Sequence, residues 1–250
     1  MTATASTCNR PTTSNRPQTM KFAIIAAGEG SRLASEGVKS PKPMIQLQGT
    51  PIIERLVRIF MRHGATTISI IVNEEQPETL AHLKELQKEF PIDIVVRNTP
   101  SSMHSMHALS HLLRGDKFCL TTVDTLFHED EFDSYIKALE DSDDGIMAVT
   151  DYIDDEKPLY VETDGELNIT AFGDKPCETS RYISGGIYGL SPKALDILDD
   201  CMREGVSRMR NFQRRLVESG MKLKAYPFSK IIDIDHAEDI AKAEKFLSEI

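Results

Sequence analysis

The stretch KFAIIAAGEGSRLASEGVKSPKPM, from Lys21 to Met44, decides the fold of this chain. It opens with an apolar run, residues 22–27, which ends at a glycine and is therefore predicted to be a buried strand. Gly28 and Gly30 then predict a tight loop, because glycine tolerates positive φ and lets a ligand approach the backbone. Open α/β sheets bind ligands in the loops that follow the carboxyl ends of their strands. The stretch thus predicts an α/β fold with a ligand site at this loop.

The same stretch carries two cations. Arg32 lies two residues after the second glycine, and Lys42 lies between two prolines that restrict its backbone. A solvated lysine needs no such restriction, so we expect both cations to meet one anionic ligand, with an ordinary turn and a surface lysine as the alternative. The dinucleotide motif GxGxxG is absent, because Leu33 stands at its third glycine. A P-loop is absent too, because no Gly-Lys-Ser/Thr occurs.

The composition is that of an acidic globular protein. The 250 residues carry a net charge of −10 and are 40% apolar, so a sizeable core is available. Nucleic-acid binders usually show a basic footprint, which is missing. No stretch approaches the ~18 apolar residues of a membrane helix, and the four cysteines form no CxxC pair, as expected of reduced thiols. We therefore expect a cytoplasmic protein whose partners include neither nucleic acid nor a membrane.

The pattern of apolar residues divides the chain. Residues 1–20 are rich in Thr, Ser, Asn and Pro and are predicted to be a disordered leader. Strand-like and helical runs alternate over residues 21–150, which predicts right-handed βαβ units around a mostly parallel sheet. The acidic patch 141–144 is predicted to be a solvated loop. Residues 151–250 begin with a predicted hairpin, which turns at Asp164-Gly165. Helices are predicted at 52–63, 80–90, 103–113, 129–139, 191–202, 208–219 and 237–247.

AIIAAGEGSRL followed by PKPM resembles the signature of nucleotidyltransferases that act on sugar 1-phosphates and related phosphomonoesters. The resemblance spans most of residues 21–247. It implies a single domain with a three-layer α/β/α fold of the glycosyltransferase-A type and a mostly parallel central mixed sheet. It also implies that residues 21–150 bind a nucleoside triphosphate and residues 151–250 bind a phosphomonoester acceptor. The sequence leaves open whether the protein forms a homo-oligomer.

The resemblance implies roles for residues around the glycine loop. Arg32 and Lys42 would stabilise the β- and γ-phosphates and the departing pyrophosphate. The nucleotide base stays open, because Ser105-Met106 resembles phosphocholine and related cytidylyltransferases rather than the Gly-Thr-Ala of many sugar enzymes. The residues expected to contact the nucleotide are Ala26, Ala27, Gly28, Gly30, Ser31 and Ser105.

Two aspartates are expected to hold Mg²⁺. Asp124 ends the predicted strand KFCLTTVD at the same sheet edge as the glycine loop, and Mg²⁺ often uses one or two carboxylates together with phosphate oxygens. Asp235 lies in IIDIDHAEDIAKAEKFL, which resembles the family's closing motif and implies the second ligand, with Asp233 as the competing candidate. The alternative interpretation of both Asp124 and Asp235 is a helix N-cap.

The acceptor is expected to meet AFGDKPCETSRYISGGIYGLSP. Lys175 matches the family's lysine for the acceptor phosphate, whereas Asp174 stands where a glutamate often touches sugar hydroxyls. Gly185 and Gly186 would let a substrate ring lie against the backbone, or would mark a strand bulge. A sugar 1-phosphate is the first choice of acceptor, and phosphocholine or another small phospho-alcohol is the alternative.

The sequence is compatible with three classes of function. A Mg²⁺-dependent nucleotidyltransferase explains the glycine loop, Lys42 and both aspartates together. A nucleotide-binding regulatory module that has lost the chemistry is the second class, although all these residues are present. An NAD-dependent enzyme is the third class and is disfavoured by the missing third glycine.

Overall fold

The computed structural model describes residues 20–154, 156–178 and 180–249. The predicted leader lies outside them, except for Met20, which opens the first strand. The helices are α1 (Ser31–Ser35), η1 (Lys42–Met44, a 3₁₀ turn), α2 (Ile52–Arg62), α3 (Pro77–Leu86), α4 (Ser102–Leu113), α5 (Glu129–Asp141), α6 (Lys193–Arg203), α7 (Met209–Glu218) and α8 (Ala237–Ser248).

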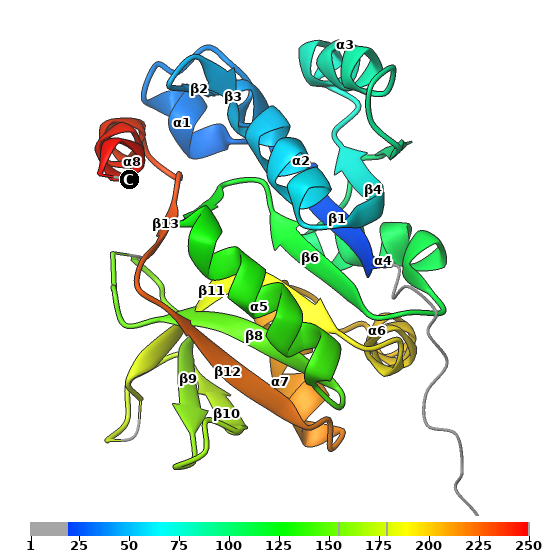
Figure 1. The fold of residues 1–250 in the computed structure, drawn as a ribbon, viewed down its shortest axis with the longest axis vertical. Coiled ribbons are helices and arrows are strands. Elements are labelled where there is room, and N and C mark those ends of the chain that lie inside the picture. Colours follow the sequence, from blue (N-terminus) through cyan, green and yellow to red (C-terminus); the bar gives the residue numbers. More distant parts are fainter. Residues whose placement is uncertain (1–19, 155, 179, 250) are drawn as a thin grey trace, which may run out of the picture.

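Strands make up the rest of the framework, and most of them join one sheet (Figure 1). The strands are β1 (Met20–Ala26), β2 (Gln46–Leu47), β3 (Thr50–Pro51), β4 (Ala65–Val72), β5 (Ile92–Val96), β6 (Phe118–Thr122), β7 (Thr125–Phe127), β8 (Gly145–Thr150), β9 (Tyr160–Thr163), β10 (Ile169–Gly173), β11 (Tyr182–Leu190), β12 (Leu223–Phe228) and β13 (Ile231–Asp233).

The main sheet is mixed, with its parallel part around β1. β1 pairs in parallel with both β4 and β6, and β5 extends this part beyond β4. β11 runs antiparallel to β6, β8 and β9, and thereby joins the two halves of the chain. Because β1, β4, β5 and β6 are parallel, their carboxyl ends lie at one edge of the sheet, as the alternation of strands and helices predicts.

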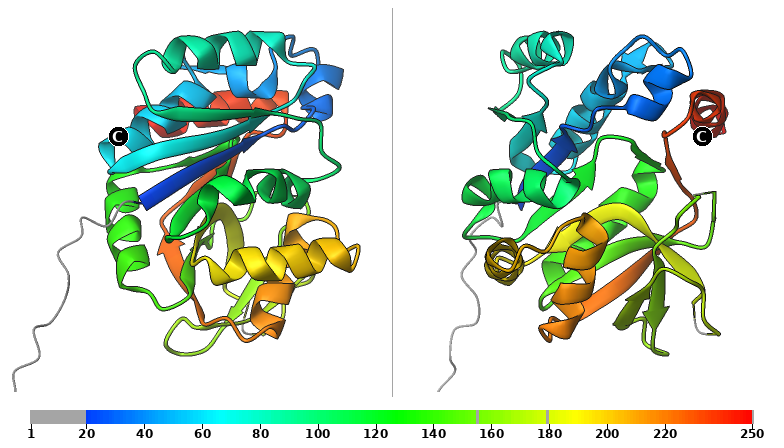
Figure 2. Two further views of the ribbon diagram at one scale, coloured as in Figure 1. Left: turned by 90° about the vertical axis from the view of Figure 1, so that its right-hand side faces the viewer. Right: turned by 180° about the vertical axis from the view of Figure 1, so that it is seen from behind.

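Helices cover both faces of the sheet, because side chains along β1 point alternately to opposite faces. Phe22 and Ile24 pack into one apolar core with α2, α5 and α8. Ala23 and Ile25 pack into the other core with α4, α6 and α7. The two turned views of Figure 2 show the resulting layers. In the described part of the chain, no helix is both long and apolar enough to cross a bilayer.

Most predicted elements are present, with shifted ends. α3 begins at Pro77, three residues before its predicted start, because proline is compatible with the first helical turn. The predicted hairpin turn is confirmed, and the Asp164 carboxylate accepts hydrogen bonds from the backbone N–H groups of Glu166 and Asn168. The short elements α1 and β7 were not predicted as separate units, and both lie next to the candidate site.

One prediction about the acidic patch is wrong. Asp144 is buried, whereas Asp141 and Asp143 are exposed. Its carboxylate accepts hydrogen bonds from Lys193 Nζ at 2.6 Å and from the backbone N–H of Lys222 at 3.0 Å. The hydrogen bond from Lys193 holds the pKa of Asp144 below its ordinary value. Asp144 therefore braces the start of β8 against α6 and the segment before β12, rather than lying in a solvated loop.

Replacing Asp144 by asparagine is expected to lower the free energy of unfolding at neutral pH by about 1–3 kcal/mol, because the buried side chain loses its charge and one of its two acceptor oxygens becomes an NH₂ group that faces a donor. A carboxyl with a lowered folded-state pKa stabilises the protein above its unfolded pKa, and that contribution is lost as the pH falls through the folded pKa. The difference between wild type and variant should therefore shrink in acid. Urea unfolding across the acidic range measures it, with Asp143→Asn as the exposed control; equal effects of the two substitutions would contradict the bracing role.

Candidate active site

A hollow of 570 Å³ lies at the edge where the parallel strands end. The glycine loop after β1 forms one wall, and the segment after β6, including Asp124, forms the floor. The predicted residues that line it are Ala27, Gly28, Gly30, Ser31, Arg32, Lys42, Ser105, Asp124 and Asp235.

The glycine loop is shaped to meet an anion. Gly30 has a φ of 64°, and a Cβ there would lie 3.3 Å from Cβ of Lys42. Glycine therefore lets the loop lie close to the lysine. Within the described residues, the backbone N–H groups of Gly28, Glu29 and Gly30 donate no hydrogen bond to the protein. These N–H groups are therefore available to the oxygens of a ligand.

Lys42 is the central cation of the hollow. Pro41 and Pro43 flank it at the start of the 3₁₀ turn η1, and its side chain is only 10% exposed. Its Nζ donates to Asp124 Oδ2 at 2.5 Å and to Asp235 Oδ1 at 2.7 Å. One buried ammonium thus joins two carboxylates that lie far apart in the sequence.

The charges of the three groups depend on one another. Burial alone would lower the pKa of Lys42, but the neighbouring charges of Asp124 and Asp235 outweigh it and raise that pKa above its ordinary value. Burial alone would raise the pKa of Asp235, but Lys42 and then Arg32 lower it. Lys42 is therefore charged, and Asp235 is ionised, across the physiological range of pH.

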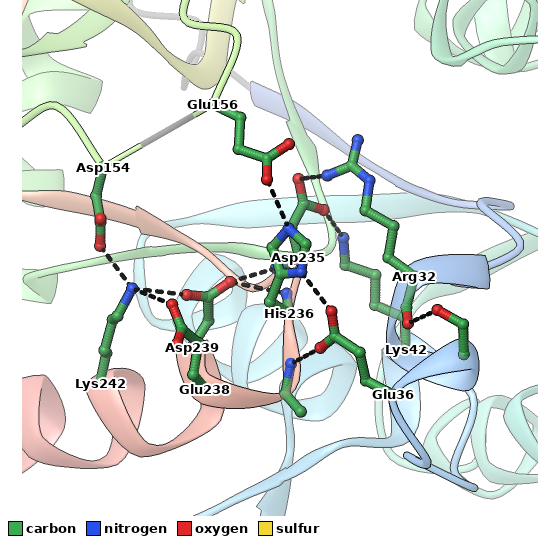
Figure 3. A network of polar contacts seen from close by, with 12 residues as sticks. Arg32, Glu36, Lys42, Asp154, Glu156, Asp235, His236, Glu238, Asp239 and Lys242 are labelled. Atoms are coloured by element: carbon green, nitrogen blue, oxygen red, sulfur yellow. Dashed lines mark hydrogen bonds and ion pairs between the residues drawn. The ribbon is translucent and has the colours of Figure 1, made fainter.

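A short pair of strands brings the two aspartates together. β13 runs antiparallel to β7, with Asp233 opposite Thr125. The pairing continues through the backbone N–H of Ile234, which donates to the carbonyl of Asp124 at 3.2 Å. The next residue, Asp235, accepts from Nη1 of Arg32 at 2.7 Å (Figure 3). The closing segment of the chain is thereby joined to the glycine loop.

The alternative role of a helix N-cap does not apply to either aspartate. β7, not a helix, follows Asp124. α8 has His236 as its N-cap, and Asp239 completes a capping box with it. The Asp239 carboxylate accepts hydrogen bonds from the backbone N–H groups of Asp235 and His236. Asp239 therefore orients the turn that carries the Asp235 side chain.

The two carboxylates fit a divalent cation. Asp124 and Asp235 already converge on one positive charge, the ammonium of Lys42. Among the described residues, no three His, Cys, Asp or Glu side chains are placed to hold a metal ion together. Mg²⁺ is compatible with a pair, because it commonly takes one or two carboxylates and completes its shell with phosphate oxygens and water. Asp233, the competing candidate, lines a second, neighbouring hollow. The hydrogen bonds of Lys42 go to Asp124 and Asp235.

A second hollow of 200 Å³ adjoins the first. Arg32 and Asp235 line both hollows. Its other walls come from β11, the segment after β8, β13 and the start of α8, which lie mainly in the predicted acceptor half. Gly185 lines this hollow. The pairing of β11 with β8 shifts register between Ser184 and Tyr188, which confirms the strand bulge predicted at Gly185 and Gly186.

Some predicted residues are not brought into either hollow. Ala26 is 1% exposed and ends β1 inside the core. Lys175 is exposed on the loop after β10 and is not among the residues that line the two described hollows. Asp174 pairs instead with Arg210 and Arg214 of α7, at 2.7 Å each. The roles predicted for Ala26 and Lys175 stay predictions.

The structure adds residues that were not predicted. Asn73 and Asn98 follow β4 and β5 and line the first hollow beside the glycine loop. The Asn98 side chain accepts a hydrogen bond from the backbone N–H of Glu74, and the Asn73 side chain accepts from Glu75. Both asparagines lie at the carboxyl ends of parallel strands, the same position that singled out Asp124. Applying that rule to every strand would have found them.

The chain resembles several known proteins. A model of the nucleotidyl transferase family matches residues 21–250. The mannose-1-phosphate guanyltransferase of Schizosaccharomyces pombe is 29% identical over 188 residues, which cover 72% of this chain and 52% of that protein. The 2-aminoethylphosphonate cytidylyltransferase of Lancefieldella rimae is 35% identical over 80 residues, which cover 30% of this chain and 29% of that protein.

The inositol-1-phosphate CTP transferase of T. maritima has a related structure, with a TM-score of 0.77 and 19% identity over 93% of this chain and 96% of that one. This structural similarity confirms the predicted fold class. The chain spans about half the length of most of the curated relatives that it matches.

Proposed function

The chain belongs to the nucleotidyl transferase family, and from this premise we propose that it transfers a nucleoside monophosphate from a nucleoside triphosphate to a phosphomonoester and releases pyrophosphate. The observation that carries the proposal is the joining of Asp124 and Asp235 by Lys42 beside the glycine loop. A nucleotide-binding module without chemistry would not need this arrangement.

The reaction is an in-line displacement. A phosphate oxygen of the acceptor attacks the α-phosphorus, the new P–O bond forms, and the bond to the β-phosphate bridging oxygen breaks. A phosphomonoester is already ionised at neutral pH, so no general base is required. Catalysis then rests on positioning and on stabilising charge in the transition state.

The residues of the first hollow have separate tasks in this reaction. The free N–H groups of the glycine loop bind phosphate oxygens, and Lys42 and Arg32 stabilise the charge that develops on pyrophosphate. Asp124 and Asp235 would hold Mg²⁺, which when bound neutralises phosphate charge and orients the phosphates. Arg32 lines both hollows, which supports the second hollow as the side from which the acceptor approaches the nucleotide.

The acceptor is proposed to be a sugar 1-phosphate. The S. pombe relative is named for mannose 1-phosphate, and it resembles most of this chain. A cytidylyltransferase that acts on phosphocholine or another small phospho-alcohol is the second candidate. The L. rimae relative, named for a small aminophosphonate, supports it with the higher identity over a shorter stretch. A cytoplasmic location and a homo-oligomer stay predictions.

A matrix of the common nucleoside triphosphates against phosphomonoesters tests the function, with pyrophosphate release as the readout. We expect pyrophosphate only when Mg²⁺, one of the triphosphates and an acceptor are all present. Nucleotide binding by calorimetry without product from any acceptor would instead indicate a module that binds nucleotides without turning them over. Binding of NAD in preference to every triphosphate would also contradict the proposal.

A further inference from the structure

Two side chains of the turn between β4 and α3 hold the carbonyl groups of the glycine loop. Gln76 Nε2 donates to the carbonyl of Gly28 at 3.0 Å, and Asn73 Nδ2 donates to the carbonyl of Ala27 at 3.4 Å. Both side chains belong to buried residues, with exposed fractions of 7% for Gln76 and 6% for Asn73. The loop after β1 is therefore held from behind by the connection that follows the neighbouring strand.

The held carbonyls set the direction of the N–H groups that follow them. A trans peptide is planar, so its C=O and its N–H point in opposite directions. Because the carbonyl of Gly28 faces Gln76, the N–H of Glu29 points away from Gln76. In the same way, the N–H of Gly28 points away from Asn73, which holds the carbonyl of Ala27. The turn thereby orients two of the N–H groups that a phosphate would meet.

The side chain of Gln76 is not explained by its own helix. Gln76 is the N-cap of α3, where a Ser, Thr, Asp or Asn side chain usually accepts a hydrogen bond from the first turn. Its side chain makes no capping bond, and its Oε1 is buried without a hydrogen-bond partner among the described residues. A buried acceptor without a partner is unusual in a folded protein. The hydrogen bond described for this side chain reaches the glycine loop instead.

We propose that Gln76 is a positioning residue for the nucleotide. It holds the peptide of Gly28 so that the N–H of Glu29 is directed at the phosphates before they bind. Gln76 is not among the residues that line the first hollow, so it acts through the loop and not by contact with the nucleotide. A loop that is ordered in advance binds more tightly, because ordering it on binding costs affinity. The inference rests on the proposed function in taking a triphosphate as the ligand of this loop.

Inorganic tripolyphosphate is the probe for this role, because it is the part that all nucleoside triphosphates share. Isothermal titration calorimetry with Mg²⁺ measures its Kd on the full chain, and the measurement requires no acceptor. Gln76→Leu nearly keeps the size of the side chain but removes the donor to the carbonyl of Gly28. We expect the Kd of this variant for tripolyphosphate to be about tenfold higher than that of the wild type.

Gln87→Leu is the matched control. Gln87 lies at the other end of α3, and its Nε2 donates to the carbonyl of Ile92 at 2.7 Å. The substitution removes the same kind of hydrogen bond from the same helix, outside both described hollows. Thermal unfolding should show that both variants are folded at the assay temperature. Gln87→Leu should bind tripolyphosphate as tightly as the wild type does.

Two further measurements separate positioning from a purely structural role. In nuclear magnetic resonance spectra of the isotope-labelled protein, saturating tripolyphosphate should shift the amide resonance of Glu29 strongly in the wild type and in Gln87→Leu, and weakly in Gln76→Leu. In pyrophosphate release, Gln76→Leu should raise KM for the triphosphate and leave KM for the acceptor unchanged. A general loosening of α3 would produce neither pattern.

The outcomes separate this inference from the proposed function. Unchanged binding of tripolyphosphate by Gln76→Leu would overturn the inference, and so would an equal loss in Gln87→Leu, because the effect would then belong to the stability of α3. Absence of binding by the wild type would overturn it as well. A wild type that binds tripolyphosphate as expected, but releases no pyrophosphate with any acceptor, would overturn the proposed function and leave the inference standing.

Discussion

Replacing Lys42 by alanine is expected to lower kcat/KM for pyrophosphate release by at least about a hundredfold, as removal of one charge-stabilising group does in other active sites. The ammonium of Lys42 is held beside the glycine loop by two carboxylates, and its side chain is 10% exposed. Alanine puts no charged group in its place, so the charge that develops on the phosphates loses a fixed positive partner. Steady-state pyrophosphate release with saturating Mg²⁺ measures the effect.

Lys39→Ala is the matched control for this prediction, because Lys39 is an exposed lysine in the same connection between β1 and β2. It should retain wild-type turnover. The Lys42 variant also leaves Asp124 and Asp235 without their shared partner, so circular dichroism and thermal unfolding must establish that it is folded at the assay temperature. A folded Lys42→Ala protein with near wild-type turnover would contradict the role of Lys42.

Asp124→Asn is expected to produce a loss of similar size, again about a hundredfold or more in kcat/KM. Asparagine keeps the shape of the side chain but removes the charge that Mg²⁺ requires, so the Mg²⁺ concentration for half-maximal rate should also rise. A Mg²⁺ titration of pyrophosphate release measures both effects. Asp116→Asn is the control, since this exposed aspartate precedes the same strand, β6, at its opposite end.

The partner of Asp124 is tested in the same titration. Asp235→Asn should resemble Asp124→Asn, because Lys42 contacts both carboxylates. Asp233→Asn should have the weaker effect on Mg²⁺ dependence, because Asp233 lines only the second hollow. The reverse order of effects would move the metal site to Asp233.

Much of this architecture could be predicted from local sequence patterns. The apolar run before Gly28 is β1, and the helical spacing from Ile52 onward is α2, because burial imposes these periods on the residues. The position of Asp124 followed from one rule, that parallel strands end at a common edge. The same rule predicted a ligand at the glycine loop, whereas Lys42 was singled out by the two prolines that flank it.

What could not be predicted depends on contacts between distant segments. β7 and β13 are three residues each, too short to show a period, yet their pairing places Asp235 beside Asp124. The sequence also does not reveal that Arg210 and Arg214 of α7 bind Asp174. Resemblance supplied Asp235 as a candidate, but only the register of β13 explains why it reaches the glycine loop.

The most direct test is a crystal structure of the protein with Mg²⁺ and a nucleoside triphosphate analogue that resists cleavage between its α- and β-phosphates. The triphosphate should lie against the backbone of residues 28–30, with Lys42 and Arg32 in contact with its oxygens and Mg²⁺ bound by Asp124 and Asp235. A nucleotide bound elsewhere, or a metal ion that contacts neither aspartate, would contradict the convergence of these groups on one triphosphate.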